Sequence, residues 1–384
     1  MGQHALLSPS SSHRWLHCTA APMLEANEPD RDTDYTKEGT LAHAYCAKLL
    51  KMMVGQPTEA EDREILELHD EYYTDEMFEH AETYCAIVGE KLTKATLAVK
   101  DSELIVEKRL DFTKWVPGAF GTADAIIITD GTMEVIDFKY GKGVEVSAEW
   151  NPQMMIYALG AIYLYENEYN IRQVRMTIVQ PRLNNLSEFK LPVHALDWWA
   201  ETVLRPKARE ALTEGRQECG EWCRFCKVKT RCAKFAGDCL DIADRFGGRE
   251  TVTDEEMARE ILPRLAQIKA WASSMEEYAL GKALQGTHFE GYKLVEGRSI
   301  RKITDPAALA ELLIGKGFDP ERIYKPKELE TLTALERLVG KKDFTALAGD
   351  LVVKPQGKPT LVPESDKRPA IDTVSQDFDA FAEN

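Results

Sequence analysis

The chain has 384 residues, a formal net charge of −16 and a hydrophobic share of 44%. This length predicts two or more domains, or one domain with extensions, and the apolar share is sufficient for a hydrophobic core. The strong negative charge argues against a protein that coats nucleic acid without selectivity.

The N-terminus and the apolar segments indicate where the protein works. Met1–His4 lacks the basic start of a secretory signal, and no signal-like apolar run follows it. The longest apolar stretch, Met154–Tyr165, is too short to span a bilayer. We therefore expect a soluble, cytoplasmic protein without a membrane partner, and its oligomeric state stays open.

Residues 1–53 are predicted to form N-terminal helices that carry Cys18 and His43. Thr40 is expected to cap the helix on which His43 lies. A lone histidine is more often structural than a ligand, so His43 becomes a candidate only together with other residues. Residues 59–98 are predicted to form one long amphipathic helix.

Two apolar runs rich in β-branched residues, 118–129 and 132–140, predict neighbouring strands. Asp130-Gly131 lies between them and is a strong signal for a two-residue hairpin turn. If Thr129 pairs with Thr132, the two strands have a defined register. Further strands are predicted at 103–111 and 172–181, and helices at 152–167 and 195–216.

This register brings acidic side chains together at the open end of the hairpin. Asp124 is expected directly opposite Asp137, with Cβ atoms about 5 Å apart. Because side chains alternate along a strand, Lys139 shares the face of Asp137 while Phe138 points the other way. Two carboxylates in an apolar sheet repel each other and resist desolvation. A bound Mg²⁺ or Mn²⁺ removes that conflict.

The helix that follows adds an amide and a phenol. Pro152 suits the first turn of a helix, and Gln153 and Tyr157 lie on one face because they are four residues apart. These two side chains are candidates to hold a DNA phosphate or to orient an attacking water. Glu107, on the predicted strand 103–111, is a candidate for an extra metal ligand, but we expect a solvated strand residue.

Three of the eight cysteines have the close spacing Cys223-x2-Cys226-x5-Cys232. In a chain without a secretory signal, this spacing indicates a metal or an iron–sulfur cluster rather than disulfides. A four-thiolate site needs one more ligand, and the candidates are Cys18, Cys219 and Cys239. A local zinc site that uses Cys219 stays open as the competing interpretation.

Taken together, these motifs resemble the RecB-like branch of the PD-(D/E)xK nucleases. The order is His43, Gly121-x-x-Asp124, Asp137-x-Lys139 and Gln153-x3-Tyr157. One early cysteine followed by a distant cysteine triplet resembles the iron–sulfur variant of that branch, which occurs in the AddB helicase-nuclease subunit and in CRISPR adaptation nucleases. The resemblance covers roughly residues 5–240. The chain is also similar to an uncharacterised family encoded by phages and prophages near single-strand-annealing proteins.

The resemblance implies a role for each matching residue. His43, Asp124, Asp137 and the backbone carbonyl of Phe138 would hold one or two Mg²⁺ or Mn²⁺ ions. Lys139 would orient or deprotonate the attacking water and stabilise charge on the phosphate, while Gln153 and Tyr157 would position the scissile strand. Cys18, Cys223, Cys226 and Cys232 would hold a 4Fe-4S cluster that staples the two ends of the nuclease domain.

The expected fold class is α/β, with a PD-(D/E)xK core of a mixed sheet flanked by helices and an α-rich C-terminal extension. Residues 1–240 would form the nuclease domain, 241–353 a mostly helical accessory region and 354–384 a disordered or loosely docked tail. The implied function is a metal-dependent DNA nuclease, an exonuclease in phage recombination or DNA processing, with DNA and a single-strand-annealing protein as partners. A non-catalytic DNA-binding scaffold and a zinc-bound interaction module remain the alternatives.

Overall fold

The computed structural model describes residues 5–29, 33–99, 101–246, 251–293, 295 and 314. The chain divides into two compact units, Met1–Lys282 and Ala283–Asn384, and the sheet described below belongs to the first. Of the second unit, the described part is the end of one helix and the few residues after it. The predicted tail, 354–384, lies outside the described residues, as does most of the predicted accessory region beyond residue 293.

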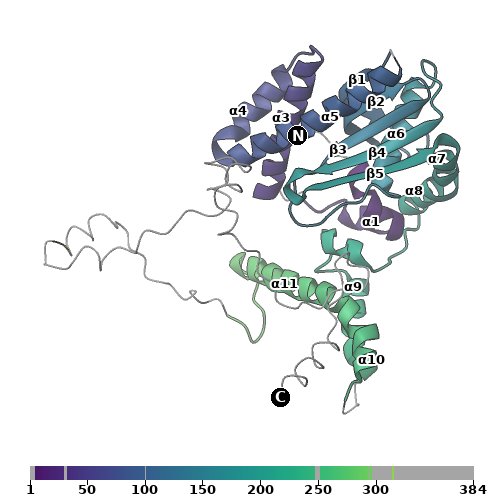
Figure 1. Ribbon diagram of the computed structural model, residues 1–384. Helices are drawn as coiled ribbons and strands as arrows, with labels where there is room; N and C mark the ends of the chain where they lie inside the picture. Colours follow the sequence, from purple (N-terminus) through teal and green to yellow (C-terminus); the bar gives the residue numbers. More distant parts are fainter. Residues whose placement is uncertain are drawn as a thin grey trace, which may run out of the picture. The chain divides into compact units, whose positions relative to one another are not determined.

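A five-stranded mixed sheet forms the centre of the first unit (Figure 1). Its strands are β1 (Glu103–Asp111), β2 (Phe120–Thr129), β3 (Thr132–Phe138), β4 (Gln173–Gln180) and β5 (Asn185–Pro192), and they lie side by side in that order. Strands β3 and β4 run parallel, and every other neighbouring pair runs antiparallel. The predicted mixed α/β fold is therefore confirmed at the level of the sheet and its flanking helices.

The β2–β3 hairpin has the predicted register. Thr129 pairs with Thr132 across the Asp130-Gly131 turn, and the ladder continues to Ala125 opposite Ile136. Gly131 has a φ of +91°, a conformation that glycine adopts without steric cost. The next residues along the two strands are the two predicted site aspartates.

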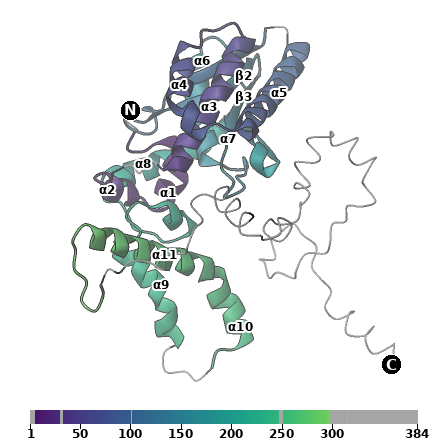
Figure 2. The ribbon, with the colours of Figure 1, turned by 90° about the vertical axis from the view of Figure 1, so that its left-hand side faces the viewer.

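One face of the sheet is covered by α3 (Asp34–Met53) and α5 (Asp75–Ala98). Figure 2 shows both helices in front of β2 and β3. The sheet residues that point to this side include Ile127, Ile136 and Phe138, which share one buried core with the helices. This packing fixes α3 against the strands that carry the predicted acidic residues.

The opposite face is covered mainly by α6 (Pro152–Tyr165), with α1 (Ser12–His17) beside it. Ile126, Ile128 and Val135 point to this side and belong to a second core. Alternate strand residues thus enter two separate cores, which gives three layers. Helix α6 also forms the crossover connection between the parallel strands β3 and β4.

The remaining described helices complete the two units. They are α2 (Ala21–Glu25), α4 (Glu59–Tyr72), α7 (Val193–Trp199), α8 (Arg205–Leu212), α9 (Ala233–Phe246), α10 (Asp254–Glu256) and α11 (Leu262–Leu284). Short 3-10 helices lie at Pro9–Ser11 (η1), Pro181–Leu183 (η2) and Glu221–Phe225 (η4), and π-helical segments at Ala200–Leu204 (η3) and Met257–Ile261 (η5).

The first unit extends beyond the predicted boundary at residue 240. Helix α9 crosses that position without a break. Ile268 and Trp271 of α11 also pack against a small core that contains Phe235 and Cys239. Because these apolar contacts hold α9 and α11 together, the structure ends the first unit at Lys282.

The predicted single helix over 59–98 is wrong. The backbone becomes extended at Tyr73 and Thr74, and α5 starts anew after them. The hydroxyl of Thr74 accepts a hydrogen bond from the backbone N–H of Met77 at 3.1 Å. This capping bond, followed by acidic residues in the first turn, favours a helix start over continuation of α4.

The predicted cap at Thr40 is also wrong. Helix α3 begins earlier, at Asp34, where the hydroxyl of Thr33 accepts a hydrogen bond from the backbone N–H of Thr36 at 3.2 Å. Thr40 lies inside the helix and its hydroxyl donates to the carbonyl of Thr36 at 3.0 Å. His43 is therefore on the third turn of a long helix rather than near its start.

Strand β5 was not predicted. Asn184, with a φ of +50°, ends the short turn after β4 and reverses the chain. The strand lies at the edge of the sheet, and within the described part of the chain it pairs only with β4. Polar residues, among them Ser187, Glu188 and Lys190, interrupt this segment. It therefore lacks the regular alternation of apolar residues on which strand prediction depends.

Gly160 of α6 permits the close approach of a buried ring. A Cβ at this position would lie 2.3 Å from Cε1 of Phe112, whose side chain is fully buried. We expect Gly160→Ala to lower the free energy of unfolding by about 1–3 kcal/mol because the added methyl overpacks the core. Gly281→Ala in α11 is the control: nothing lies within 4 Å there, so helix propensity should raise stability by up to about 1 kcal/mol. Equal melting temperatures for the two variants would contradict this packing.

Candidate metal centre

Three side chains from three elements converge beside the end of the hairpin. His43 comes from α3, Glu107 from β1 and Asp124 from β2, and one ligand atom of each lies within 4.8 Å of the other two. Nδ1 of His43 is 3.4 Å from Oδ1 of Asp124. An imidazole and two carboxylates at this separation form a donor set that suits a divalent cation.

Packing and a backbone hydrogen bond position His43 and Asp124. The His43 ring meets the buried ring of Phe138 edge-on, with centroids 5.2 Å apart. Oδ2 of Asp124 accepts a hydrogen bond from the backbone N–H of Phe138 at 2.7 Å. Phe138, expected to offer its carbonyl, thus contributes its N–H to fix Asp124 and its ring to support His43.

Glu107 is part of this group, so the expectation of a solvated strand residue is wrong. Its neighbours Val106 and Lys108 pair with Ala125 and Ala123, which places Glu107 opposite Asp124. Glu107 is half-buried and has a φ of +51°. Such a conformation is uncommon for a residue with a side chain, and it occurs preferentially at functional sites.

The charges of the three residues are strongly coupled. Burial and the Asp124 carboxylate raise the pKa of Glu107 to about 8. Burial disfavours the imidazolium form of His43, but Asp124, Asp137 and Glu107 outweigh it and raise its pKa to about 9. Burial opposes ionisation of Asp124, yet His43 and the Phe138 N–H lower its pKa. Bound protons partly neutralise the negative charge of the clustered carboxylates, and a divalent cation would neutralise it more fully. The three residues therefore fit a divalent metal ion.

Metal binding is expected to release between about one and two protons near pH 7.5. His43, with a pKa of about 9, must lose its proton before its nitrogen can bind a metal ion. Glu107, with a pKa of about 8, is partly protonated at this pH and must lose that fraction of a proton. Mn²⁺ affinity should therefore rise as the pH rises from 7 to 9. Calorimetric titration in buffers of different ionisation enthalpy measures the release, and an affinity independent of pH over this range would contradict the charge arrangement.

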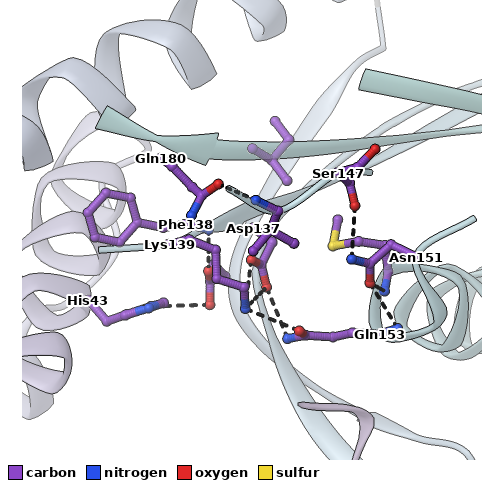
Figure 3. A network of polar contacts seen from close by, with 12 residues as sticks. His43, Asp137, Phe138, Lys139, Ser147, Asn151, Gln153 and Gln180 are labelled. Atoms are coloured by element: carbon purple, nitrogen blue, oxygen red, sulfur yellow. Dashed lines mark hydrogen bonds and ion pairs between the residues drawn. The ribbon is translucent and has the colours of Figure 1, made fainter. Parts of the chain in front are cut away.

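A second group lies beside the first. Oδ1 of Asp137 accepts hydrogen bonds from Nζ of Lys139 at 3.3 Å and from Nε2 of Gln153 at 3.2 Å. Nζ of Lys139 also donates to Oε1 of Gln153 at 3.1 Å. Figure 3 shows these three side chains pointing toward one another. The structure thus brings together the predicted aspartate, lysine and glutamine.

Hydrogen bonds and charge compensate the burial of the Asp137 carboxylate only in part. Its side chain is buried, and Oδ2 lies 3.0 Å from Nζ of Lys139 without forming a hydrogen bond. Burial raises the pKa of Asp137 against the effect of Lys139. Burial also opposes the charge on Lys139, but Asp137 and Asp124 raise its pKa. Lys139 is therefore a protonated ammonium near neutral pH.

Tyr157 belongs to the core rather than to an open surface. It is buried, and its ring lies 6.0 Å from that of Phe112. Burial, with Asp137 and Asp124 nearby, raises its pKa, so the phenol stays neutral. A Cβ at Gly121 would lie 3.0 Å from this ring. The glycine of the Gly121-x-x-Asp124 motif thus makes room for Tyr157.

Gln180 was missed by the sequence analysis, although it ends β4 next to the site. It is buried, its Oε1 accepts from the N–H of Val146 at 2.7 Å, and its Nε2 donates to the carbonyl of Val144 at 3.0 Å. Gln180 therefore ties down the loop between β3 and α6. Its position directly before Pro181, at the end of a strand parallel to β3, was the available signal.

Five cysteines line one cavity. They are Cys18, Cys219, Cys223, Cys226 and Cys232, and Arg14, Lys229 and Lys234 line it as well. No three cysteine sulfurs among the described residues lie within 4.8 Å of one another. A tetrahedral zinc site, with Zn–S bonds of about 2.3 Å, needs sulfurs closer than that. The thiols therefore share a cavity without forming a compact group.

Hydrogen bonds link the N-terminal segment, which carries Cys18, to the segment that carries the other cysteines of the cavity. The backbone N–H of Arg216 donates to the hydroxyl of Thr19 at 2.8 Å, and that of Lys227 to Oε1 of Glu25 at 2.6 Å. Burial and nearby Glu25 raise the pKa of Cys226 to about 12, and burial with neighbouring thiols raises that of Cys219 to about 12. These thiols are neutral unless a positive centre binds them.

No described helix combines the length and the apolar character needed to cross a membrane.

Comparison with known proteins gives similarities to solved structures and a match to a family model. The chain is similar to a solved structure described as "Crystal structure of SSO0001", with 13% sequence identity, a TM-score of 0.26, and coverage of 61% of this chain and 88% of that chain. The model of a family described as "Protein of unknown function (DUF2800)" matches residues 4–369. Because this match spans nearly the whole sequence, the chain belongs to the DUF2800 family.

Proposed function

We propose that the protein is a metal-dependent phosphodiester hydrolase that acts on DNA, and that its sheet and flanking helices are a PD-(D/E)xK nuclease core. The observation that carries the proposal is the convergence of His43, Glu107 and Asp124 within 4.8 Å. Beside them, Asp137 and Lys139 form the acid and ammonium that phosphodiester hydrolysis uses. DNA as the substrate rests on the resemblance of the sequence motifs to those of the RecB-like nucleases.

When bound at this centre, a divalent cation would supply Lewis-acid catalysis, because such an ion lowers the pKa of water and stabilises charge on a phosphate. His43, Glu107 and Asp124 would hold the ion. Lys139, protonated between Asp137 and Gln153, serves as a fixed positive charge for the developing oxyanion rather than as a base. This refines the expected role of Lys139 in deprotonating water.

Gln153 positions the ammonium. Asn151 caps α6 by accepting hydrogen bonds from the N–H groups of Gln153 and Met154 at 3.1 and 3.3 Å. This cap fixes the start of the helix, so the Gln153 amide reaches both Asp137 and Lys139. The neutral phenol of Tyr157 packs one turn later and holds the helix against the hairpin.

Digestion of end-labelled single- and double-stranded DNA with Mg²⁺ or Mn²⁺ tests the proposal. Wild-type protein should cut, EDTA should stop cutting, and Asp137→Ala should be inactive. Asp130→Ala is the matched control, because Asp130 is exposed in the turn of the same hairpin. Binding of DNA without cutting in either metal would favour the non-catalytic scaffold. Labels at the two ends reveal whether cutting starts at an end, as the proposed recombination exonuclease requires.

We also propose that the cysteine cavity holds a 4Fe-4S cluster, with Cys223, Cys226, Cys232 and Cys18 as ligands. The support is the fit of the lining: five thiols with three cations beside them suit an anionic cluster larger than a single ion. Anaerobic preparation should give brown protein that absorbs near about 400 nm and contains iron and sulfide, and Cys18→Ala should lose it. Colourless protein with one zinc ion per chain would support the zinc alternative with Cys219 instead.

A further inference from the structure

Trp150 has a backbone conformation that its residue type disfavours, on the loop that leads into the candidate metal centre. Its φ is +50°. Two other described non-glycine residues have a positive φ: Asn184, a residue type that tolerates this region, and Glu107, a candidate ligand. A bulky residue in this conformation is a genuine outlier that the surrounding structure must enforce, and such outliers cluster at functional sites.

The loop around Trp150 is held by hydrogen bonds to the sheet and to α6. The N–H of Ala148 donates to the hydroxyl of Ser187 at 2.9 Å, and Nδ2 of Asn151 donates to the carbonyl of Ser147 at 3.0 Å. Figure 3 shows Asn151 between Ser147 and Gln153. The bonds on both sides of Trp150 fix its backbone, so the position of the indole is set by the scaffold of the site.

The side chain of Trp150 is largely exposed to solvent. Trp150 is 55% exposed, and its ring meets that of Phe189 at a tilt of 50° with centroids 5.3 Å apart. A large apolar side chain that the backbone conformation presents to solvent gains little from folding. A ligand with a flat apolar face would recover that surface.

Trp150 lies a short distance along the chain from a residue of the site. It precedes Gln153 by three residues, so their Cα atoms are at most about 11 Å apart. Gln153 contacts both Asp137 and Lys139. At about 3.4 Å of rise per nucleotide, this distance from Gln153 corresponds to about three nucleotides of a strand.

We propose that Trp150 stacks on an unpaired nucleobase of the DNA strand whose phosphate lies at the metal centre. This inference rests on the proposed function. Every base has an aromatic face, and a base inside a duplex has both faces covered by its neighbours, so stacking on a side chain selects an unpaired base. The protein therefore binds strands with a single-stranded segment in preference to blunt duplexes.

Anisotropy of a labelled oligonucleotide tests the inference, with Mg²⁺ present and Lys139→Met as the background so that the strand is not cut. Trp150→Ala should weaken binding of single strands about 5- to 150-fold, and Trp150→Phe should retain most of the affinity. Trp198→Ala is the matched control, because Trp198 is 66% exposed on α7. An abasic nucleotide scanned along the strand should, at one position, weaken binding to the Trp150 protein by the same factor and leave the Trp150→Ala protein unaffected.

The outcomes separate this inference from the proposed function. Trp150→Ala binding equal to Trp198→Ala binding on every strand would overturn the stacking inference, while metal-dependent cutting by the wild type would still stand. A base-specific loss in Trp150→Ala without cutting by the wild type in either metal would refute the hydrolase and keep the stacking contact. Weaker binding that no abasic position reproduces would also overturn the inference, because it indicates a loop defect rather than a lost stack.

Discussion

Asp124→Asn is expected to lower the rate of metal-dependent DNA hydrolysis by at least about 10²-fold and to weaken Mn²⁺ binding by a similar factor. Asp124 lies within reach of both His43 and Glu107 and is the acid that binds the N–H of Phe138. The asparagine oxygen still accepts that hydrogen bond, so the strand stays in place. The variant loses the negative charge of Asp124, and this loss also lowers the pKa of His43.

Asp130→Asn serves as the control for this change. It removes the same charge from the same hairpin at an exposed turn, so both activity and Mn²⁺ affinity should match those of the wild type. Circular dichroism of the two variants should be alike. Full activity of a normally folded Asp124→Asn variant would show that Asp124 is not a residue of the active site.

Lys139→Met is expected to lower kcat by about 10²–10³-fold while Mn²⁺ binding is kept or strengthened. The methionine retains the length of the side chain but removes the ammonium from Asp137 and Gln153. Removing a positive charge beside a cation site reduces repulsion of the metal. This separation of rate from metal affinity distinguishes Lys139 from Asp124, whose loss lowers both.

Lys190→Met is the matched control, because Lys190 is exposed on the edge strand β5. Its kcat should equal that of the wild type. Lys139→Met with an unchanged kcat would show that the ammonium has no part in the transition state. A loss of Mn²⁺ binding in Lys139→Met would mean that the lysine supports the fold of the site instead.

The hairpin could be predicted because its signals are local. An Asp-Gly turn fixes the pairing of the two adjoining strands, and alternation then assigns each side chain to a face. For the same reason the start of α6 at Pro152 followed from the sequence. The placement of Asp124, Asp137 and Lys139 depends on these local signals, whereas the role of Gln153 rested on the family resemblance. The structure brings Asp137, Lys139 and Gln153 together.

Glu107 could not be assigned because its position depends on a longer connection. Residues between β1 and β2 form an irregular loop in which the N–H of Phe112 bonds to the carbonyl of Ala119 at 3.0 Å. No turn rule sets the register across such a loop, and no propensity predicts a glutamate with a φ of +51°. Glu107 is therefore recognised as the third candidate ligand only from the pairing of β1 with β2 in the structure.

The helix predicted over 59–98 shows how local capping overrides periodicity. The apolar repeat continues through residue 73, yet Thr74 with Asp75 and Glu76 after it forms a complete start signal. Similarly, the strain at Trp150 has no signature in the sequence, because it results from hydrogen bonds to β5 and α6 that exist only in the folded chain.

Diffraction from crystals soaked in Mn²⁺, recorded at a wavelength where manganese scatters anomalously, tests the central claim most directly. The account predicts an anomalous peak between His43, Glu107 and Asp124, with each ligand atom about 2.0–2.3 Å from it, and no such peak in Asp124→Asn crystals. Saturating Mn²⁺ that leaves these three side chains without a peak would contradict the metal centre and the hydrolase built on it.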